Sequence, residues 1–148
     1  MNFLDSIWMI PLFPLAGAAV MLLAGKILDP QTAGGGGRPH AAGAKFVVSL
    51  LCPGLVLLSF LFSAGAVLQL ASTPGKVHQV IQHAWVAGLP FRLADGSLAR
   101  FSADWGFLLD PLSSVMILVV TFVGFLIHVY SIGYMGHEGG YYRFFGYM

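Results

Sequence analysis

The chain has 148 residues, of which 57% are hydrophobic and only 9% are charged. An ordinary soluble domain carries roughly 25% charged residues, so too little polar surface exists here to cover a water-soluble globule. The formal net charge is +1 and the basic residues are scattered, which excludes the basic patch of a nucleic-acid-binding protein. The single cysteine, Cys52, excludes an intramolecular disulfide and a cysteine-rich metal site. These features indicate a protein of the lipid bilayer.

The first long apolar segment covers residues 7–25 and contains no charged side chain. At 1.5 Å per residue it reaches about 28 Å, close to the hydrocarbon thickness of a bilayer. A signal peptide would need basic residues before the apolar segment, whereas this chain has Asp5 there and no Lys or Arg. Pro11 and Pro14 fall in the expected first turns, where a missing backbone donor costs least. We therefore expect a first membrane-spanning helix.

Two further apolar segments, at residues 46–71 and 112–134, are also long enough to cross a bilayer. The third segment follows Asp110 and Pro111, and proline is well tolerated at the start of a helix. Asp110 is a candidate N-cap. The sequence thus predicts an all-α integral membrane fold with three transmembrane helices at about residues 7–25, 46–71 and 112–134.

The segments between these helices differ in composition. Residues 26–45 contain four consecutive glycines and two prolines, which predicts a flexible loop. Residues 72–110 are rich in β-favouring side chains from Trp85 onwards and contain Asp95 followed by Gly96, a strong hairpin-turn pair. We expect a small external β-hairpin between the second and third helices. Trp85 and Trp105 are placed to lie at the membrane interface.

The loop charges predict an orientation. The first loop contributes Lys26, Arg38 and Lys45, and no basic residue precedes the first helix, although the longer second loop also carries basic residues. Because basic loops stay on the cytoplasmic side, we expect the glycine-rich loop inside and the N-terminus and hairpin outside. The tail at residues 141–148 is aromatic and apolar with no cap or breaker, so we expect the start of a fourth helix and a chain that is the N-terminal part of a larger subunit.

One ionisable side chain, His128, lies inside the third apolar segment. Ionisable residues within a membrane are energetically costly and usually face a protein interior or a watery cavity. At 100° per residue, His128 shares one arc of the helix with Ser114, Thr121, Gly124 and Ser131, which predicts an inward-facing stripe. Two roles stay open: handling a proton, or a structural hydrogen bond to a neighbouring helix near the interface.

Other combinations of chemically active residues give weaker signals. His78 and His83 are five residues apart, about 140° on a helix, so we expect no shared metal site. The glycines before Lys45 do not match the spacing of a phosphate-binding loop. We find no serine–histidine–acid set, paired carboxylates or dinucleotide fingerprint, so the sequence predicts neither a cofactor nor a metal in this chain.

The segment at residues 109–148 carries three markers in order: LDPLS, then FLIHVYSIGYM, then RFF. In combination they resemble the L subunit of proton-pumping NADH:quinone oxidoreductase, respiratory complex I. The upstream similarity is looser and follows the family's order of a first helix with an early proline, a second helix and a tryptophan-bearing external hairpin.

This resemblance implies an antiporter-like subunit in the membrane arm, which contributes to proton translocation coupled to quinone reduction. The implied partners are the other membrane subunits and the lipid bilayer, and the implied location is the bacterial inner membrane. NADH, FMN, iron–sulfur clusters and quinone would be used by the whole complex, with the redox centres in other subunits. The chain ends before the family's glutamate-bearing and broken helices, so we expect it to be inactive alone. His128 lies on a matching motif position, which implies a supporting role in the proton path or in helix packing.

Three other types of membrane protein share some of these features. Within the superfamily these are the large subunit of a multi-subunit Na⁺/H⁺ antiporter and a membrane subunit of a related hydrogenase complex, and the HVYSIGYM and RFF segments favour complex I over both. The third is a non-catalytic small membrane scaffold complete as three helices. The unfinished tail at residues 141–148 argues against that scaffold.

Overall fold

A computed structural model describes residues 2–28, 42–137 and 140–148 of the chain. In this part of the chain the elements are α1 (Met9–Leu28), α2 (Ala42–Ala71), β1 (His78–Arg92), β2 (Leu98–Leu109), α3 (Pro111–Tyr134), the 3₁₀ turn Met135–His137 and α4 (Tyr141–Tyr147). The prediction of three long helices, a hairpin and the start of a fourth helix is confirmed at this level. The ends of the predicted loop at residues 26–45 belong to α1 and α2, and residues 29–41 lie outside the described residues.

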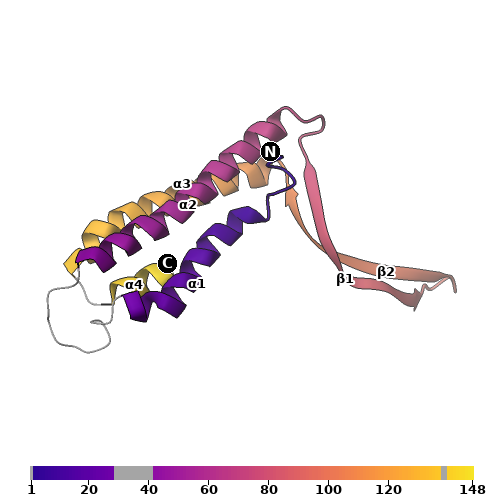
Figure 1. Cartoon of the computed structure of the whole chain (residues 1–148). Coiled ribbons are helices and arrows are strands. Elements are labelled where there is room, and N and C mark those ends of the chain that lie inside the picture. Colours follow the sequence, from indigo (N-terminus) through magenta and orange to yellow (C-terminus); the bar gives the residue numbers. More distant parts are fainter. Residues whose placement is uncertain (1, 29–41, 138–139) are drawn as a thin grey trace.

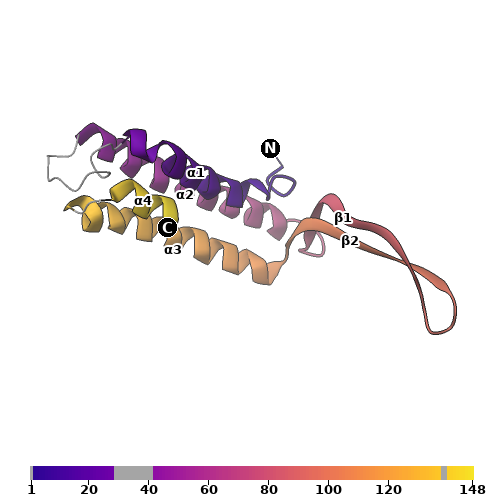
Figure 2. The same ribbon diagram turned by 90° about the horizontal axis from the view of Figure 1, so that it is seen from below.

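The helices form a bundle in which α2 is central. It packs against α1 on one side and α3 on the other, and α4 packs mainly against α1. Figure 1 shows the three long helices side by side with the hairpin projecting from one end of the bundle. In the view from below, α4 lies between α1 and α3 at the end remote from the hairpin (Figure 2). The helix α4 therefore belongs to the same bundle as the three long helices.

The inner face of α2 repeats every seven residues. Its buried positions alternate in steps of four and three: Cys52, Val56, Ser59, Ser63, Ala66 and Leu70. This is the seam spacing of helices that pack with a small crossing angle. Ser59 and Ser63 on this face are almost completely buried, as is typical of small residues where helices pack closely.

Two described helices are long and apolar enough to cross a membrane, by length and composition. They are Lys45–Ala71 within α2 and Pro111–Tyr134, which is α3. The apolar part of α1, Met9–Gly25, is shorter. Much of the outer surface of these helices is apolar and exposed, including Leu23 and Leu68. Such a surface is suited to lipid.

The start of α1 differs from the prediction. The helix begins at Met9, two residues later than predicted, and Pro14 lies inside it, beyond the turn whose N–H groups have no partner in the helix. A proline at this position removes the N–H that would bond to the carbonyl of Ile10, four residues earlier. The structure supplies a replacement, because the hydroxyl of Ser59 on α2 donates to the carbonyl oxygen of Ile10 at 2.7 Å. The carbonyl group that Pro14 leaves without a donor in α1 therefore bonds to α2 and connects the two helices.

The hairpin is longer than predicted. Its first strand begins at His78 and not at Trp85, and the strands pair antiparallel with several irregularities in register. The predicted turn is confirmed: Asp95 accepts hydrogen bonds from the backbone N–H and hydroxyl of Ser97, and Gly96 has φ +85°. The two tryptophan rings lie 6.1 Å apart and Trp85 is 70% exposed, whereas its place at a membrane interface stays a prediction.

A capping box starts α3, as proposed for Asp110. The Asp110 carboxylate accepts from the backbone N–H of Ser113 at 2.7 Å, while the Ser113 hydroxyl accepts from the Asp110 N–H at 2.8 Å. The hydrogen bonds from Ser113, first the backbone and then the side chain, hold the pKa of Asp110 below its ordinary value. Because the folded pKa is lowered, the ionised cap stabilises the fold above the unfolded pKa and loses that effect as the pH falls through the folded pKa.

We expect Asp110→Ala to lower the stability of the chain at neutral pH, since the backbone N–H and the hydroxyl of Ser113 lose their shared acceptor at the start of α3. The difference from the wild type should shrink as the pH falls below about 4, the ordinary value for aspartate. Unfolding midpoints in mixed micelles from pH 7 to pH 3 measure this. A difference that stays constant over the whole range would contradict a role for the ionised cap.

Candidate functional site

The polar residues of α3 share its inner face, as predicted. The buried residues of this helix are Ser114, Thr121, His128 and Ser131, and His128 is only 8% exposed. The remaining positions are mostly Val, Ile, Leu and Phe, many of them exposed. The periodicity of the sequence therefore located the polar stripe correctly.

Two hydroxyls of this stripe bond to the preceding turn of their own chain segment, whereas the Ser131 hydroxyl donates to the sulfur of Met148 at 3.7 Å. The hydroxyl of Ser114 donates to the carbonyl of Asp110 at 2.7 Å, and that of Thr121 to the carbonyl of Ile117 at 2.6 Å. Both acceptors lie four residues earlier on the same helix. Such local bonding is open to Ser and Thr in any helix and needs no partner helix.

His128 follows the same local pattern and so has a defined tautomer. Its Nδ1 lies 2.8 Å from the carbonyl oxygen of Gly124. A carbonyl can only accept, so Nδ1 carries the proton. In the neutral ring Nε2 then holds a lone pair, and no hydrogen bond to it comes from the part of the chain that the structure describes. Nε2 is therefore the nitrogen that can take up a proton.

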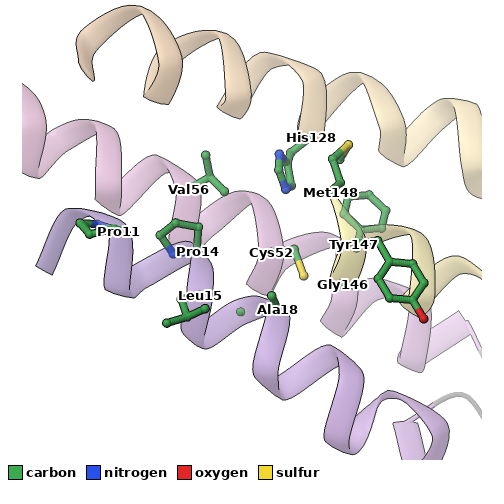
Figure 3. Close-up of a pocket in the computed structure, with 12 residues that line it drawn as sticks. Pro11, Pro14, Leu15, Ala18, Cys52, Val56, His128, Gly146, Tyr147 and Met148 are labelled. Carbon is green, nitrogen blue, oxygen red and sulfur yellow. The ribbon is translucent and has the colours of Figure 1, made fainter. Parts of the chain in front are cut away.

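The ring of His128 lines a partly open cavity of about 310 Å³ bordered by α1, α2, α3 and α4. Figure 3 shows the ring pointing from α3 into the space opposite Pro14 of α1 and Cys52 of α2. The ring of Phe145 lies 5.9 Å from that of His128, and Met148 completes this side. A water occupies about 30 Å³ in the liquid, so the cavity has room for several. Its walls are mostly apolar, with the imidazole and the thiol as polar groups.

The wall formed by α4 depends on two glycines. The Tyr142 ring packs directly on Gly25 of α1, and Gly146 of α4 lies against Met21 and Leu22. A Cβ atom at Gly25 would overlap the Tyr142 ring, and one at Gly146 would lie 3.2 Å from the Met21 side chain. These close approaches bring Phe145 and Met148 to the cavity.

A second polar group lies where α2 begins. Lys45 donates through Nζ to the carbonyl of Gly136 at 2.6 Å and lies 5.5 Å from the centre of the Tyr141 ring. The Tyr141 hydroxyl is 2.6 Å from that of Ser49. Lys45 was assigned to the first loop, whereas it belongs to α2 and stabilises the carbonyl end of the α3 segment.

The hairpin histidines form no metal site in the described residues, where no group of three His, Cys, Asp or Glu side chains comes together. They lie on strand β1 and not on a helix, so the helical angle used to separate them does not apply. His78 instead approaches Asp5, with its Nε2 3.4 Å from the carboxylate but outside hydrogen-bond geometry.

Comparison with known proteins gives a family for the part of the chain that carries His128. Residues 97–145 match the family model described as NADH-Ubiquinone oxidoreductase (complex I), chain 5 N-terminus. The resemblance to the complex I L subunit is confirmed.

Individual relatives agree with the family match. NAD(P)H-quinone oxidoreductase subunit 5, chloroplastic, from Fagopyrum esculentum subsp. ancestrale is 33% identical over 141 residues, which are 95% of this chain and 16% of the relative. The subunit 5 proteins of Poa pratensis and Hordeum vulgare are each 52% identical over 48 residues, 32% of this chain and 7% and 6% of theirs. This chain thus spans about a sixth of the first relative's length.

The subunit 5 match covers β2, α3 and most of α4, and so includes His128 and Phe145. The opposite wall, with Pro14 and Cys52, comes from helices outside it. Sequence reasoning singled out His128 but missed the role of Cys52. Counting back from Ser59 in steps of three and four would have placed Cys52 on the same face of α2.

Proposed function

We propose that this chain is part of a membrane-arm subunit of NADH:quinone oxidoreductase and contributes to proton translocation coupled to quinone reduction. The observation that carries the proposal is the subunit 5 match over residues 97–145, since the matched segment includes α3 and its buried histidine. NADH, FMN, iron–sulfur clusters and quinone are handled by other subunits, which are the partners of this one. The chain acts by shaping a proton-conducting interior and not by redox chemistry.

We propose further that all three long helices cross the bilayer, in a bacterial inner membrane. The apolar part of α1, Met9–Gly25, spans about 26 Å at 1.5 Å per residue, slightly less than the hydrocarbon thickness. It lies alongside α2, so both cross the same layer. The basic loop between them favours an inside position, with the N-terminus and the hairpin outside.

The proposed orientation predicts which positions an impermeant thiol reagent reaches. Single cysteines at Gly35 and Asp95, in a Cys52→Ser background, mark the first loop and the hairpin turn. In right-side-out vesicles we expect labelling at Asp95→Cys and protection at Gly35→Cys, and detergent should make both reactive. Labelling at Gly35→Cys with protection at Asp95→Cys would reverse the orientation.

We propose that His128 supports proton movement through the Nε2 of its ring, which lines the cavity. His128→Gln keeps a hydrogen-bonding side chain but cannot bind a proton near neutral pH, whereas His128→Leu removes the polar group at similar bulk. In the intact subunit we expect both variants to assemble and to move fewer protons per electron. Proton-to-electron ratios and assembly levels of the complex measure this.

The same pair of variants tests the structural alternative. If His128 only packs against Phe145 and bonds to Gly124, then His128→Gln should behave as the wild type and His128→Leu should lower assembly. Wild-type pumping by both would show that the imidazole is dispensable. The 148-residue chain alone in liposomes is the negative control, since we expect it to give no uncoupler-sensitive acidification.

A further inference from the structure

A narrow apolar groove of about 220 Å³ lies between α2 and α3 at the hairpin end of the bundle. It is separate from the His128 cavity, with which it shares no residue. Its walls are two helical faces: Val67, Leu70 and Ala71 of α2, and Ser114, Val115 and Leu118 of α3. Val115 and the neighbouring Leu112 and Leu68 are largely exposed, so the groove opens on the outer surface of the helix pair.

Helical spacing shows where the groove ends. On α2, Phe60 precedes the groove residue Val67 by seven positions and lies on the same helical face. On α3, Phe122 follows the groove residue Val115 by seven positions and also lies on the same face. The two phenyl rings are in contact across the helices, with centroids 5.2 Å apart. They close the space between α2 and α3 on the side remote from the hairpin. The groove is thus a slot on the hairpin side of this ring contact.

A single cation stands at the open end. Lys76 lines the groove and is exposed. It ends a turn in which its N–H donates to the carbonyl of Thr73, with Gly75 at φ +82° and Lys76 itself at φ +50°, a left-handed conformation that non-glycine residues rarely adopt. Within the described residues no carboxylate lies within ion-pair distance of Lys76.

Asp110 is the acidic residue next to the groove, and its carboxylate is already hydrogen-bonded within its own turn. Asp110 immediately precedes Pro111, which lines the slot, but its carboxylate accepts from the backbone and hydroxyl of Ser113. Lys76 is therefore the cation available to a ligand at this opening. The arrangement combines a deep apolar slot with one positive charge at the boundary.

We propose that this slot binds an anionic phospholipid, with an acyl chain between α2 and α3 and the phosphate at Lys76. Apolar walls favour an acyl chain over water, and a lysine at the boundary attracts a lipid phosphate. A zwitterionic lipid carries its own cation beside the phosphate, so it gains less from Lys76. The inference requires that α2 and α3 cross a bilayer, and it does not depend on proton pumping.

The test uses the full chain in phosphatidylcholine vesicles with spin-labelled phosphatidylglycerol or phosphatidylcholine as the probe. Electron paramagnetic resonance gives the relative association of each lipid with the protein. We expect the wild type to prefer phosphatidylglycerol by about fivefold, the ratio expected for one lysine near an anionic headgroup. Lys76→Gln should abolish the preference, whereas Arg100→Gln on the hairpin should keep it. Equal loss in both variants would indicate diffuse surface charge and overturn the site.

A second pair of variants tests the slot itself. Ala71→Phe fills the groove, whereas Leu68→Phe places the same aromatic ring at an exposed position that does not line it. We expect Ala71→Phe to reduce the strongly bound fraction of phosphatidylglycerol and Leu68→Phe to leave it unchanged. Circular dichroism confirms that both variants keep their helices. Unchanged binding in Ala71→Phe would overturn the proposal even if Lys76→Gln had lowered the preference.

Discussion

Replacing Gly25 with alanine is expected to destabilise the chain by about 1–3 kcal/mol, the usual cost of adding bulk to a packed contact. A Cβ atom at Gly25 would overlap the ring of Tyr142. Tyr142 is buried and lies in the cluster formed with Met21, Val48 and Phe145, so its ring cannot simply move aside. We therefore expect α4 to shift away from α1. The unfolding midpoint in mixed detergent micelles measures the loss.

Gly54→Ala provides the matched control on α2. No atom lies within 4 Å of a Cβ built at Gly54, so the same substitution meets open space there. Because alanine favours a helix interior over glycine by about 1 kcal/mol, Gly54→Ala should leave stability unchanged or raise it. In a Tyr142→Ala background the cost of Gly25→Ala should disappear. Similar losses in both glycine variants, or a loss that persists without Tyr142, would show that the contact does not carry the effect.

Removing the hydroxyl of Ser59 is expected to cost about 1–3 kcal/mol, the penalty for a buried polar group left without a partner. In Ser59→Ala the carbonyl of Ile10 loses its donor, and Pro14 cannot replace it. Pro14→Ala restores an N–H that can bond to Ile10 within α1. We therefore expect Ser59→Ala to be less costly in the Pro14→Ala background, and unfolding midpoints of the four proteins in this cycle give the coupling.

Ser63→Ala is the control for this cycle. The Ser63 hydroxyl is equally buried but donates to the carbonyl of Ser59 on its own helix. Its loss leaves no carbonyl on another helix unpaired, so we expect a smaller effect that does not depend on Pro14. Purely additive costs of Ser59→Ala and Pro14→Ala would mean that the proline defect and the serine act independently.

The elements that the sequence predicted are those set by local pattern. Long uncharged segments determined the helices, the Asp95–Gly96 pair determined the turn, and the 100° period of α3 placed His128 on the inner face. The start of β1 at His78 was missed because its Gln and His residues have little β preference and are held by pairing with β2.

The rest of the site depends on contacts between distant segments. Pro14 and Cys52 meet His128 only because α1 and α3 both pack on α2. Phe145 reaches the cavity because α4 fits against Gly25, more than a hundred residues earlier in the chain. Neither periodicity nor spacing within one segment contains this information. The buried position of the histidine could therefore be predicted, whereas its surroundings could not.

The local hydrogen bonds of Ser114 and Thr121 determine how easily these hydroxyl groups can change their hydrogen-bond partners. A hydroxyl bonded to the carbonyl four residues earlier shares that carbonyl with the helix backbone, so its release leaves the helical hydrogen bond in place. For Thr121 the exchange needs only a rotation about χ1 between staggered rotamers. Such rotations are far faster than the movement of a helix. The hydroxyls of Ser114 and Thr121 can therefore change their hydrogen-bond partners while the backbone of α3 stays fixed.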